Sequence, residues 1–202
     1  MRTLAALVFP GFQTLDFFGP MEMLGAAGDD IEIVTVALSN DPVPSVHGQR
    51  IVVDRLLSEK DDYDLLFIPG GDAGLTAAEN PEFMQWIRRA GENAERVMAV
   101  CTGTVILGMT GLLDGRKATT NKVDFTATIP LAPKVDWVKQ ARWVRDGKFY
   151  TSSGVSAGMD MALAAAADLF GMDHAEYTAR TTEYNWQKDP AIDPFAKLEG
   201  LV

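Results

Sequence analysis

A single cysteine, Cys101, is the residue whose surroundings most suggest chemistry. It follows the strand-like run Arg96–Val100 and precedes a small-residue stretch and an apolar helical pattern. A nucleophile on a tight strand-to-helix turn needs small neighbours because the backbone is strained and closely packed, and Gly103 meets that need. The N-terminus of a helix also favours a thiolate. A lone cysteine is equally typical of a buried core thiol, so the local pattern alone supports both interpretations.

Two other strand-like segments also end in residues that could contribute. Asp16 lies in the first turn of a predicted helix, and Gly70-Gly71 follow another buried strand. Because the carboxyl ends of parallel strands meet at one edge of a sheet, we expect these residues near Cys101. A glycine amide could then form an oxyanion hole with the amide of Thr102. The plainer interpretations are a turn for the glycines and a dipole-complementing role for the aspartate.

Apolar runs alternate with amphipathic segments along the chain. The predicted strands are Leu4–Phe9, Ile31–Ala37, Asp64–Ile68, Arg96–Val100 and Lys117–Thr119. The predicted helices are Thr14–Ala27, Pro81 to about Ala94 with Asn80 as N-cap, Thr102–Thr110, Val123–Ile129, Ala157–Phe170 with Ser156 as N-cap, and Asp173 to about Trp186. Continuous apolar strands separated by helices are typical of a parallel sheet covered on both faces.

Two hairpins are also expected. The segment Val43–Val53 has His47-Gly48 at its turn, and Asp146-Gly147 separates two short strands. We therefore predict an α/β fold, a flavodoxin-like three-layer sandwich with a mostly parallel central sheet and Cys101 on a nucleophile elbow. One domain is expected over residues 1–186, and residues 187–202 are expected to form an extended tail.

The composition of the chain argues against several classes of binding partner. The 202-residue chain carries a net charge of −10, which argues against binding to nucleic acid or to anionic lipid surfaces. The sequence contains no run of about 18 apolar residues, so no membrane-spanning helix is expected. The apolar start resembles a buried strand more than a signal peptide. One cysteine fits a reducing compartment, so we expect a cytoplasmic protein.

No resident metal or cofactor is expected. The chain has two histidines, His47 and His174, far from each other and from Cys101 in sequence, which makes a poor set of metal ligands. No glycine-rich dinucleotide fingerprint or P-loop pattern is present. A small molecule is the expected partner.

Four segments together resemble the ThiJ/PfpI superfamily, which is related to class I glutamine amidotransferases. They are GFQTLDFFGPMEML, DLLFIPGGDAG, VMAVCTGTVILGMTGLLDGRKATT and TSSGVSAGMDMALAAAADLFG. The resemblance runs from about Arg2 to Tyr184. Asp16 within LDFFGP and Cys101-Thr102-Gly103 are most similar to the isocyanide (isonitrile) hydratase branch; regulator-fused relatives are also similar, but a DNA-binding domain is not seen here.

The sequence departs from other branches at informative positions. Protease-like and glyoxalase-like members place a histidine where this chain has Thr102, and many carry a glutamate where it has Asp16. Both histidines are expected at the surface, which disfavours a cysteine–histidine mechanism. The stretch 118–122 reads ATTNK where many of the hydratases read ATTHW, which leaves the substrate open.

The resemblance implies a lyase that hydrates a small isocyanide to an N-substituted formamide through a covalent thioimidate. Its implied catalytic residues are Cys101, Asp16 and Thr102. The pocket would be lined by Gly70, Gly71, Ser153, Gly154 and Val155.

The family resemblance also implies a homodimer with its active sites near the interface. Five aromatic residues are expected in the core or dimer interface rather than against substrate: Phe17, Phe18, Trp137, Tyr184 and Trp186. Two alternative functions stay open, a non-enzymatic redox or metabolite sensor and a glyoxalase or deglycase.

Overall fold

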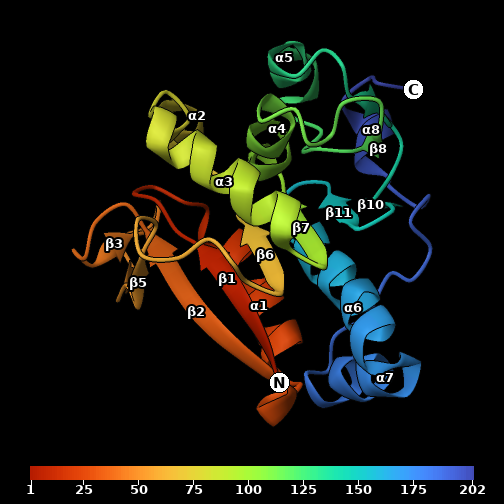
Figure 1. The fold of residues 1–202 in the computed structure, drawn as a ribbon. Helices are drawn as coiled ribbons and strands as arrows, with labels where there is room; N and C mark the ends of the chain where they lie inside the picture. The colour runs from red at the N-terminus through yellow and green to blue at the C-terminus, as the bar shows by residue number, and fades with distance from the viewer.

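A seven-stranded sheet forms the centre of the computed structural model, which describes residues 1–202 (Figure 1). The strand order is β10-β11-β7-β6-β1-β2-β5, and every neighbouring pair is parallel except β10 and β11. The strands are β1 (Arg2–Leu7), β2 (Ile31–Ala37), β5 (Arg55–Leu56), β6 (Leu65–Ile68), β7 (Arg96–Val100), β10 (Trp143–Asp146) and β11 (Phe149–Ser152). The predicted mostly parallel sheet is confirmed.

Helices cover both faces of this sheet and complete the predicted three-layer sandwich. On one face α1, α6 and α7 pack together, and α2, α3 and α4 lie on the other (Figure 1). The helix bounds are α1 (Thr14–Gly25), α2 (Ala73–Ala77), α3 (Pro81–Asn93), α4 (Thr102–Met109), α5 (Phe125–Thr128), α6 (Ala157–Phe170), α7 (Met172–Thr181) and α8 (Phe195–Leu198). None of these helices is long and apolar enough to cross a membrane.

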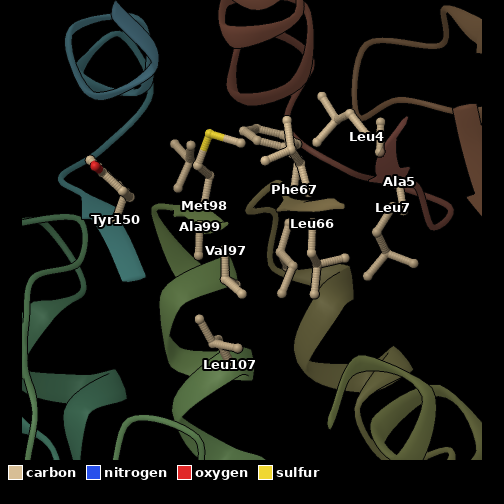
Figure 2. Packing of buried hydrophobic residues seen from close by; sticks show 14 of the residues in the cluster. Leu4, Ala5, Leu7, Leu66, Phe67, Val97, Met98, Ala99, Leu107 and Tyr150 are labelled. Carbon is tan, nitrogen blue, oxygen red and sulfur yellow. The ribbon is translucent and has the colours of Figure 1, made fainter. Parts of the chain in front are cut away.

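The central strands are apolar beyond their first residues because both of their faces are buried there. Figure 2 shows Phe67 and Met98 pointing to one side of the sheet, and Leu66 and Val97 pointing to the other, toward Leu107 of α4. This alternation follows from the two-residue period of a strand. Burial on both faces therefore explains the continuous apolar runs in the sequence.

Both predicted hairpins are present. In the first, β3 (Val43–Pro44) pairs antiparallel with β4 (Arg50–Ile51), and β10 pairs with β11 in the second. The predicted cap at Asn80 also forms, because its Oδ1 accepts a hydrogen bond from the Glu82 amide at 2.9 Å. The strand predicted at Lys117–Thr119 is present as β8 (Lys117–Ala118). It pairs with β9 (Asp136–Trp137) in a small separate sheet.

Some local predictions were wrong. Ser156 makes no side-chain cap to α6; its Oγ instead accepts a hydrogen bond from the Arg142 guanidinium at 3.1 Å. The last long helix ends at Thr181, before the left-handed residue Glu183 at φ 51°. Residues 187–202 do not form a purely extended tail, because the short helix α8 lies within them and its Ala196 is fully buried.

The strand-to-helix turn at Cys101 depends on a close approach that only glycine allows. A Cβ atom at Gly103 would lie 2.5 Å from the Pro69 carbonyl oxygen and 2.6 Å from the Ile68 carbonyl oxygen. Both obstacles are backbone atoms at the end of β6, so they cannot move aside as a flexible side chain could. Gly103 thus lets the start of α4 pack against the neighbouring strand end.

We expect Gly103→Ala to lower the free energy of unfolding by about 2–4 kcal/mol, because the added methyl group overpacks this junction. Gly25→Ala is the matched control: its Cβ would lie 3.5 Å from Ile33 Cδ1, an ordinary contact, and alanine favours helix. Urea unfolding of both variants measures the difference. Equal stability of the two variants would contradict the close-approach argument.

Candidate active site

The expected convergence at the carboxyl edge of the sheet is present. Asp16 follows β1, Gly70 follows β6 and Cys101 follows β7. Asp16 Oδ2 accepts a hydrogen bond from the Gly70 amide at 3.1 Å. A Cβ atom at Gly70 would lie 2.6 Å from that oxygen and 2.7 Å from Cys101 Cβ. The absence of a side chain at Gly70 therefore brings the carboxyl group and the cysteine together.

Cys101 occupies a strained turn, as predicted for a nucleophile elbow. Its φ of 57° and ψ of −133° are unusual for a residue with a side chain. Its amide donates to the Ser152 carbonyl at 3.2 Å. Its carbonyl accepts from the Thr104 amide at 3.1 Å and from Thr120 Oγ1 at 2.7 Å. These bonds to three segments hold the strained geometry in place.

Asp16 is fully buried beside this turn. Loss of hydration raises its pKa from 3.8 to about 7, while the Gly70 amide and the Cys101 side chain act in the opposite direction by hydrogen bonding. The interaction between the Cys101 thiol and the Asp16 carboxyl group does not meet the geometry of a regular hydrogen bond. The Asp16 Oδ1 atom has no hydrogen-bond partner of regular geometry. Catalytic hydrogen bonds are often loose before substrate binds.

The thiol and the carboxyl group share one electrostatic environment. Burial raises the pKa of Cys101, and the negative charge of Asp16 raises it further. The backbone amides of Thr102 and Val155 donate toward the sulfur and lower that pKa. Asp16 therefore ionises before Cys101, and a negative charge on the sulfur would be stabilised by two amides.

The predicted role of the glycine amides differs from what is observed. The Gly70 amide binds Asp16, and the Gly71 amide donates to Thr102 Oγ1 at 2.8 Å. Neither glycine amide therefore points to an oxyanion. The Thr102 hydroxyl fixes the Gly71 loop, and no hydrogen bond links it to Asp16. The amides that lower the pKa of the Cys101 thiol are instead those of Thr102 and Val155.

Val155 reaches the sulfur because its turn is held in an uncommon conformation. Its φ is 41°, an outlier for a β-branched residue. The amide of Ser153, two residues before Val155, donates to the Arg142 carbonyl at 2.9 Å. The Arg142 guanidinium also forms a 2.8 Å ion pair with Asp160, which is almost fully buried, and bonds Ser156. These contacts position the turn 153–156 over Cys101.

A pocket of about 750 Å³ opens onto Cys101. The cysteine is half-buried and is not sealed in the core. Asp16 and Gly70 do not line the pocket, so the prediction of Gly70 in the pocket wall was wrong; both residues lie beside Cys101. The other predicted pocket residues are all in its wall, namely Gly71, Ser153, Gly154 and Val155. Thr102, which was predicted as a catalytic residue, also lines the pocket.

Several wall residues were missed by sequence reasoning. Val46 comes from the β3–β4 hairpin, residues 121–124 precede α5, and Phe195 and Glu199 come from the C-terminal segment. The unusual stretch at 118–122 was a usable signal for the second group. The hairpin and C-terminal residues carry no pattern of their own, because only the fold brings them to the pocket.

The ionisable groups of the pocket wall are mainly acidic. Asp72, Asp124 and Glu199 lie there with one lysine, Lys122. The lysine side chain is 1% exposed and pairs with Asp193 at 3.3 Å. The pocket therefore offers no unpaired cation to an anionic substrate.

Neither histidine lines the pocket. His47 is exposed and its Nδ1 is 2.8 Å from Thr14 Oγ1, while His174 packs edge-on against Phe170. None of the five aromatic residues singled out in the sequence lines the pocket. No group of three histidine, cysteine or acidic residues is arranged to hold a metal ion.

Comparisons with known proteins identify the family. Residues 2–168 match the model of the DJ-1/PfpI family. An isonitrile hydratase of Pseudomonas putida is 34% identical over 180 residues, covering 88% of this chain and 76% of that protein. The HTH-type transcriptional regulator CdhR of Pseudomonas aeruginosa is 31% identical over 169 residues, 82% of this chain and 50% of that protein.

A solved structure also matches closely. The crystal structure of a ThiJ/PfpI family protein from Pseudomonas syringae is 35% identical with a TM-score of 0.84, and the match covers 95% of this chain and 78% of that one. The sequence motifs, the fold and the cysteine elbow lead to one conclusion: this chain belongs to the DJ-1/PfpI (ThiJ/PfpI) family.

Proposed function

We propose that this protein is a cysteine-dependent hydratase that converts a small isocyanide into an N-substituted formamide. The observation that carries the proposal is the pairing of Cys101 with the buried Asp16 at the base of a pocket, with no histidine beside either residue. The pair supplies a sulfur nucleophile and a proton carrier whose pKa of about 7 suits both acid and base roles. The similarity to an isonitrile hydratase supports the same reaction.

The first half of the reaction needs one proton on the pair. Asp16 takes the thiol proton as the Cys101 sulfur bonds to the terminal carbon of the isocyanide. The same carboxyl group then gives that proton to the carbon, which yields a covalent thioimidate, S–CH=N–R, and returns Asp16 to its carboxylate form. The amides of Thr102 and Val155 stabilise negative charge on the sulfur as it forms.

The second half releases the product. Asp16 accepts a proton from water as the water oxygen bonds to the thioimidate carbon, and it then gives that proton to the nitrogen. Collapse of this tetrahedral intermediate breaks the carbon–sulfur bond, Asp16 takes the hydroxyl proton, and HC(=O)–NH–R leaves. The pair recovers its single proton, so the net reaction adds one water molecule to the isocyanide.

The pocket supports an uncharged substrate. Its acidic side chains and the paired Lys122 disfavour carboxylates and phosphates. Apolar side chains in its wall, Val46, Val123, Val155 and Phe195, suit the hydrocarbon substituent of an isocyanide.

A sensor is the second candidate function. The similarity to a transcriptional regulator and the reachable single thiol favour it. A glyoxalase or deglycase activity is less favoured, because Thr102 stands where those branches carry a histidine. Turnover distinguishes the sensor from the hydratase.

Two further parts of the proposal concern assembly and location. A homodimer is supported by α1, which exposes the large apolar side chains of Leu15 and Phe18 beside the active site. A cytoplasmic location rests on the single free cysteine, which suits a reducing compartment.

We expect formamide production from a panel of alkyl isocyanides to be lost in Cys101→Ala. In Asp16→Asn, kcat should fall by at least about 10²-fold, because the asparagine cannot carry the proton. Infrared loss of the isocyanide band and mass detection of formamide measure both. His47→Ala is the control and should keep full activity.

Activity retained by Cys101→Ala would contradict the covalent mechanism. Absence of activity on every isocyanide tested would contradict the proposed hydratase function. Conversion of methylglyoxal to lactate would favour the glyoxalase instead.

Activity should depend on pH through the Asp16–Cys101 pair. Below about 7 both groups hold a proton and Asp16 cannot accept the thiol proton. We therefore expect kcat/KM to rise with pH through about 7 and then level, because the raised pKa of Cys101 keeps the second proton bound. A profile that is flat between pH 5.5 and 8.5, at fixed ionic strength, would contradict this assignment.

The same burial predicts that Asp16 destabilises the fold. The unfolded chain has the ordinary pKa of 3.8 and the folded protein about 7. The ionised group therefore costs stability progressively above 3.8, reaching on the order of 4 kcal/mol above pH 7. We expect Asp16→Asn to raise the free energy of unfolding by about 1–3 kcal/mol at pH 8.

That advantage should shrink as the pH falls toward 4, because the native carboxyl group is then neutral too. Chemical unfolding at pH 8 and pH 4.5 measures it. A variant that is less stable at pH 8 would show that the carboxylate is well compensated.

A further inference from the structure

The C-terminal segment forms part of the wall of the Cys101 pocket. It returns from α7 toward the end of the molecule where α4 and α5 lie (Figure 1). The Arg142 amide donates to the Pro190 carbonyl at 2.7 Å, and Phe195 and Glu199 line the pocket. The sequence patterns had predicted no role for this segment.

A buried ion pair attaches this segment to the pocket wall. Lys122 Nζ is 3.3 Å from Asp193 Oδ2, and their side chains are 1% and 0% exposed. The ammonium group also donates to Thr119 Oγ1 at 2.6 Å and to the Thr120 carbonyl at 3.1 Å. A lysine enclosed in this way is held in place by its partners and cannot reach into the pocket as a free charge.

The same aspartate orients the start of α8. Asp193 Oδ1 accepts a hydrogen bond from the Phe195 amide at 3.0 Å. Ala196, the next residue, is fully buried and fixes the helix against the protein, and its carbonyl accepts from the Leu201 amide at 2.9 Å. The anchored backbone thus determines where the Phe195 side chain lies.

Phe195 has an exposed side chain, unlike its neighbours Asp193 and Ala196. It is 48% exposed while Asp193 and Ala196 are buried, and it lines the pocket together with Val46, Val123 and Val155. Water contact with an aromatic ring is unfavourable, and a hydrocarbon group bound against the ring would relieve it. The pocket volume of about 750 Å³ leaves room for a ring-sized substituent.

We infer that Phe195 is a specificity-determining residue that contacts the apolar N-substituent of the isocyanide, and that the Lys122–Asp193 ion pair positions it. This inference rests on the proposed function and names a substrate class for it, isocyanides with a bulky hydrocarbon substituent. Lys122 is located in the stretch where the sequence departs from the hydratase pattern. The Lys122–Asp193 ion pair is therefore a feature of this chain rather than of that pattern.

The test compares Phe195→Ala with Leu198→Ala on two substrates, cyclohexyl isocyanide and methyl isocyanide. Leu198 is in the same short helix and is 74% exposed, but it does not line the pocket. Phe195→Ala should lower kcat/KM for cyclohexyl isocyanide about tenfold, the order expected for a lost apolar contact, and change that for methyl isocyanide by less than about twofold. Leu198→Ala should change neither. Equal effects on both substrates, or equal effects of both variants, would overturn the inference.

The ion pair is tested through its partners. Lys122→Met leaves the Asp193 charge buried without a partner, so amide hydrogen exchange across residues 193–201 should accelerate and the preference for cyclohexyl isocyanide should fall. Adding Asp193→Asn removes that charge and keeps an acceptor for the Phe195 amide, so the double variant should recover slow exchange and most of the preference. No change in exchange in Lys122→Met would remove the positioning role.

Alkylation of Cys101 keeps the inference separate from the hydratase proposal. The chain has one cysteine, so intact-mass measurement reports its alkylation directly. The rate ratio of N-cyclohexyl iodoacetamide to iodoacetamide should fall in Phe195→Ala and stay constant in Leu198→Ala. If no isocyanide is hydrated but this ratio falls, the proposed reaction is wrong and the apolar role of Phe195 stands. If isocyanides are hydrated and neither ratio responds to Phe195, the inference alone is wrong.

Discussion

A carboxyl group that has lost its water is the constraint on which this site depends. Asp16 is fully buried at the start of α1, and one backbone amide, from Gly70, is its only regular hydrogen-bond donor. Several such donors would hold the carboxylate ionised at low pH, whereas one donor in a dry setting leaves its pKa near 7. The parallel sheet provides that setting, because the ends of β1, β6 and β7 converge without room for solvent between them.

The nucleophile requires strain that the surrounding structure maintains. Cys101 and Val155 both adopt left-handed φ values, and each costs conformational energy of order 1–3 kcal/mol. Hydrogen bonds to the Ser152 carbonyl and from Thr104 and Thr120 hold the cysteine. The Arg142–Asp160 pair supports the turn of Val155. The backbone amide of the second strained residue, Val155, lowers the pKa of the Cys101 thiol. The surrounding structure thus compensates the conformational cost of holding Cys101 and Val155 in these orientations.

The sequence predicts the parts of this arrangement that have local patterns. Apolar runs predict the strands, and small residues after Val100 predict the elbow, since both depend on neighbours along the chain. The hydrogen-bond partners of Gly70 and Gly71 were not predictable, because they depend on which side chains the fold brings within 3 Å or so. The Lys122–Asp193 pair is a contact between distant segments, and charged residues in a polar stretch predict solvent exposure rather than burial.

The division between these two kinds of residue also explains how a family fold can serve different substrates. The cysteine elbow and its carboxyl partner come from strand ends, whose positions the sheet fixes. The rest of the pocket wall comes from a hairpin outside the central sheet, the stretch before α5 and the C-terminal segment, which no strand of the central sheet constrains. Those segments can change sequence without disturbing the nucleophile, provided that their own anchors are satisfied. A buried lysine with its aspartate is such an anchor here, and it binds the most distant segment of the chain to the wall beside Cys101.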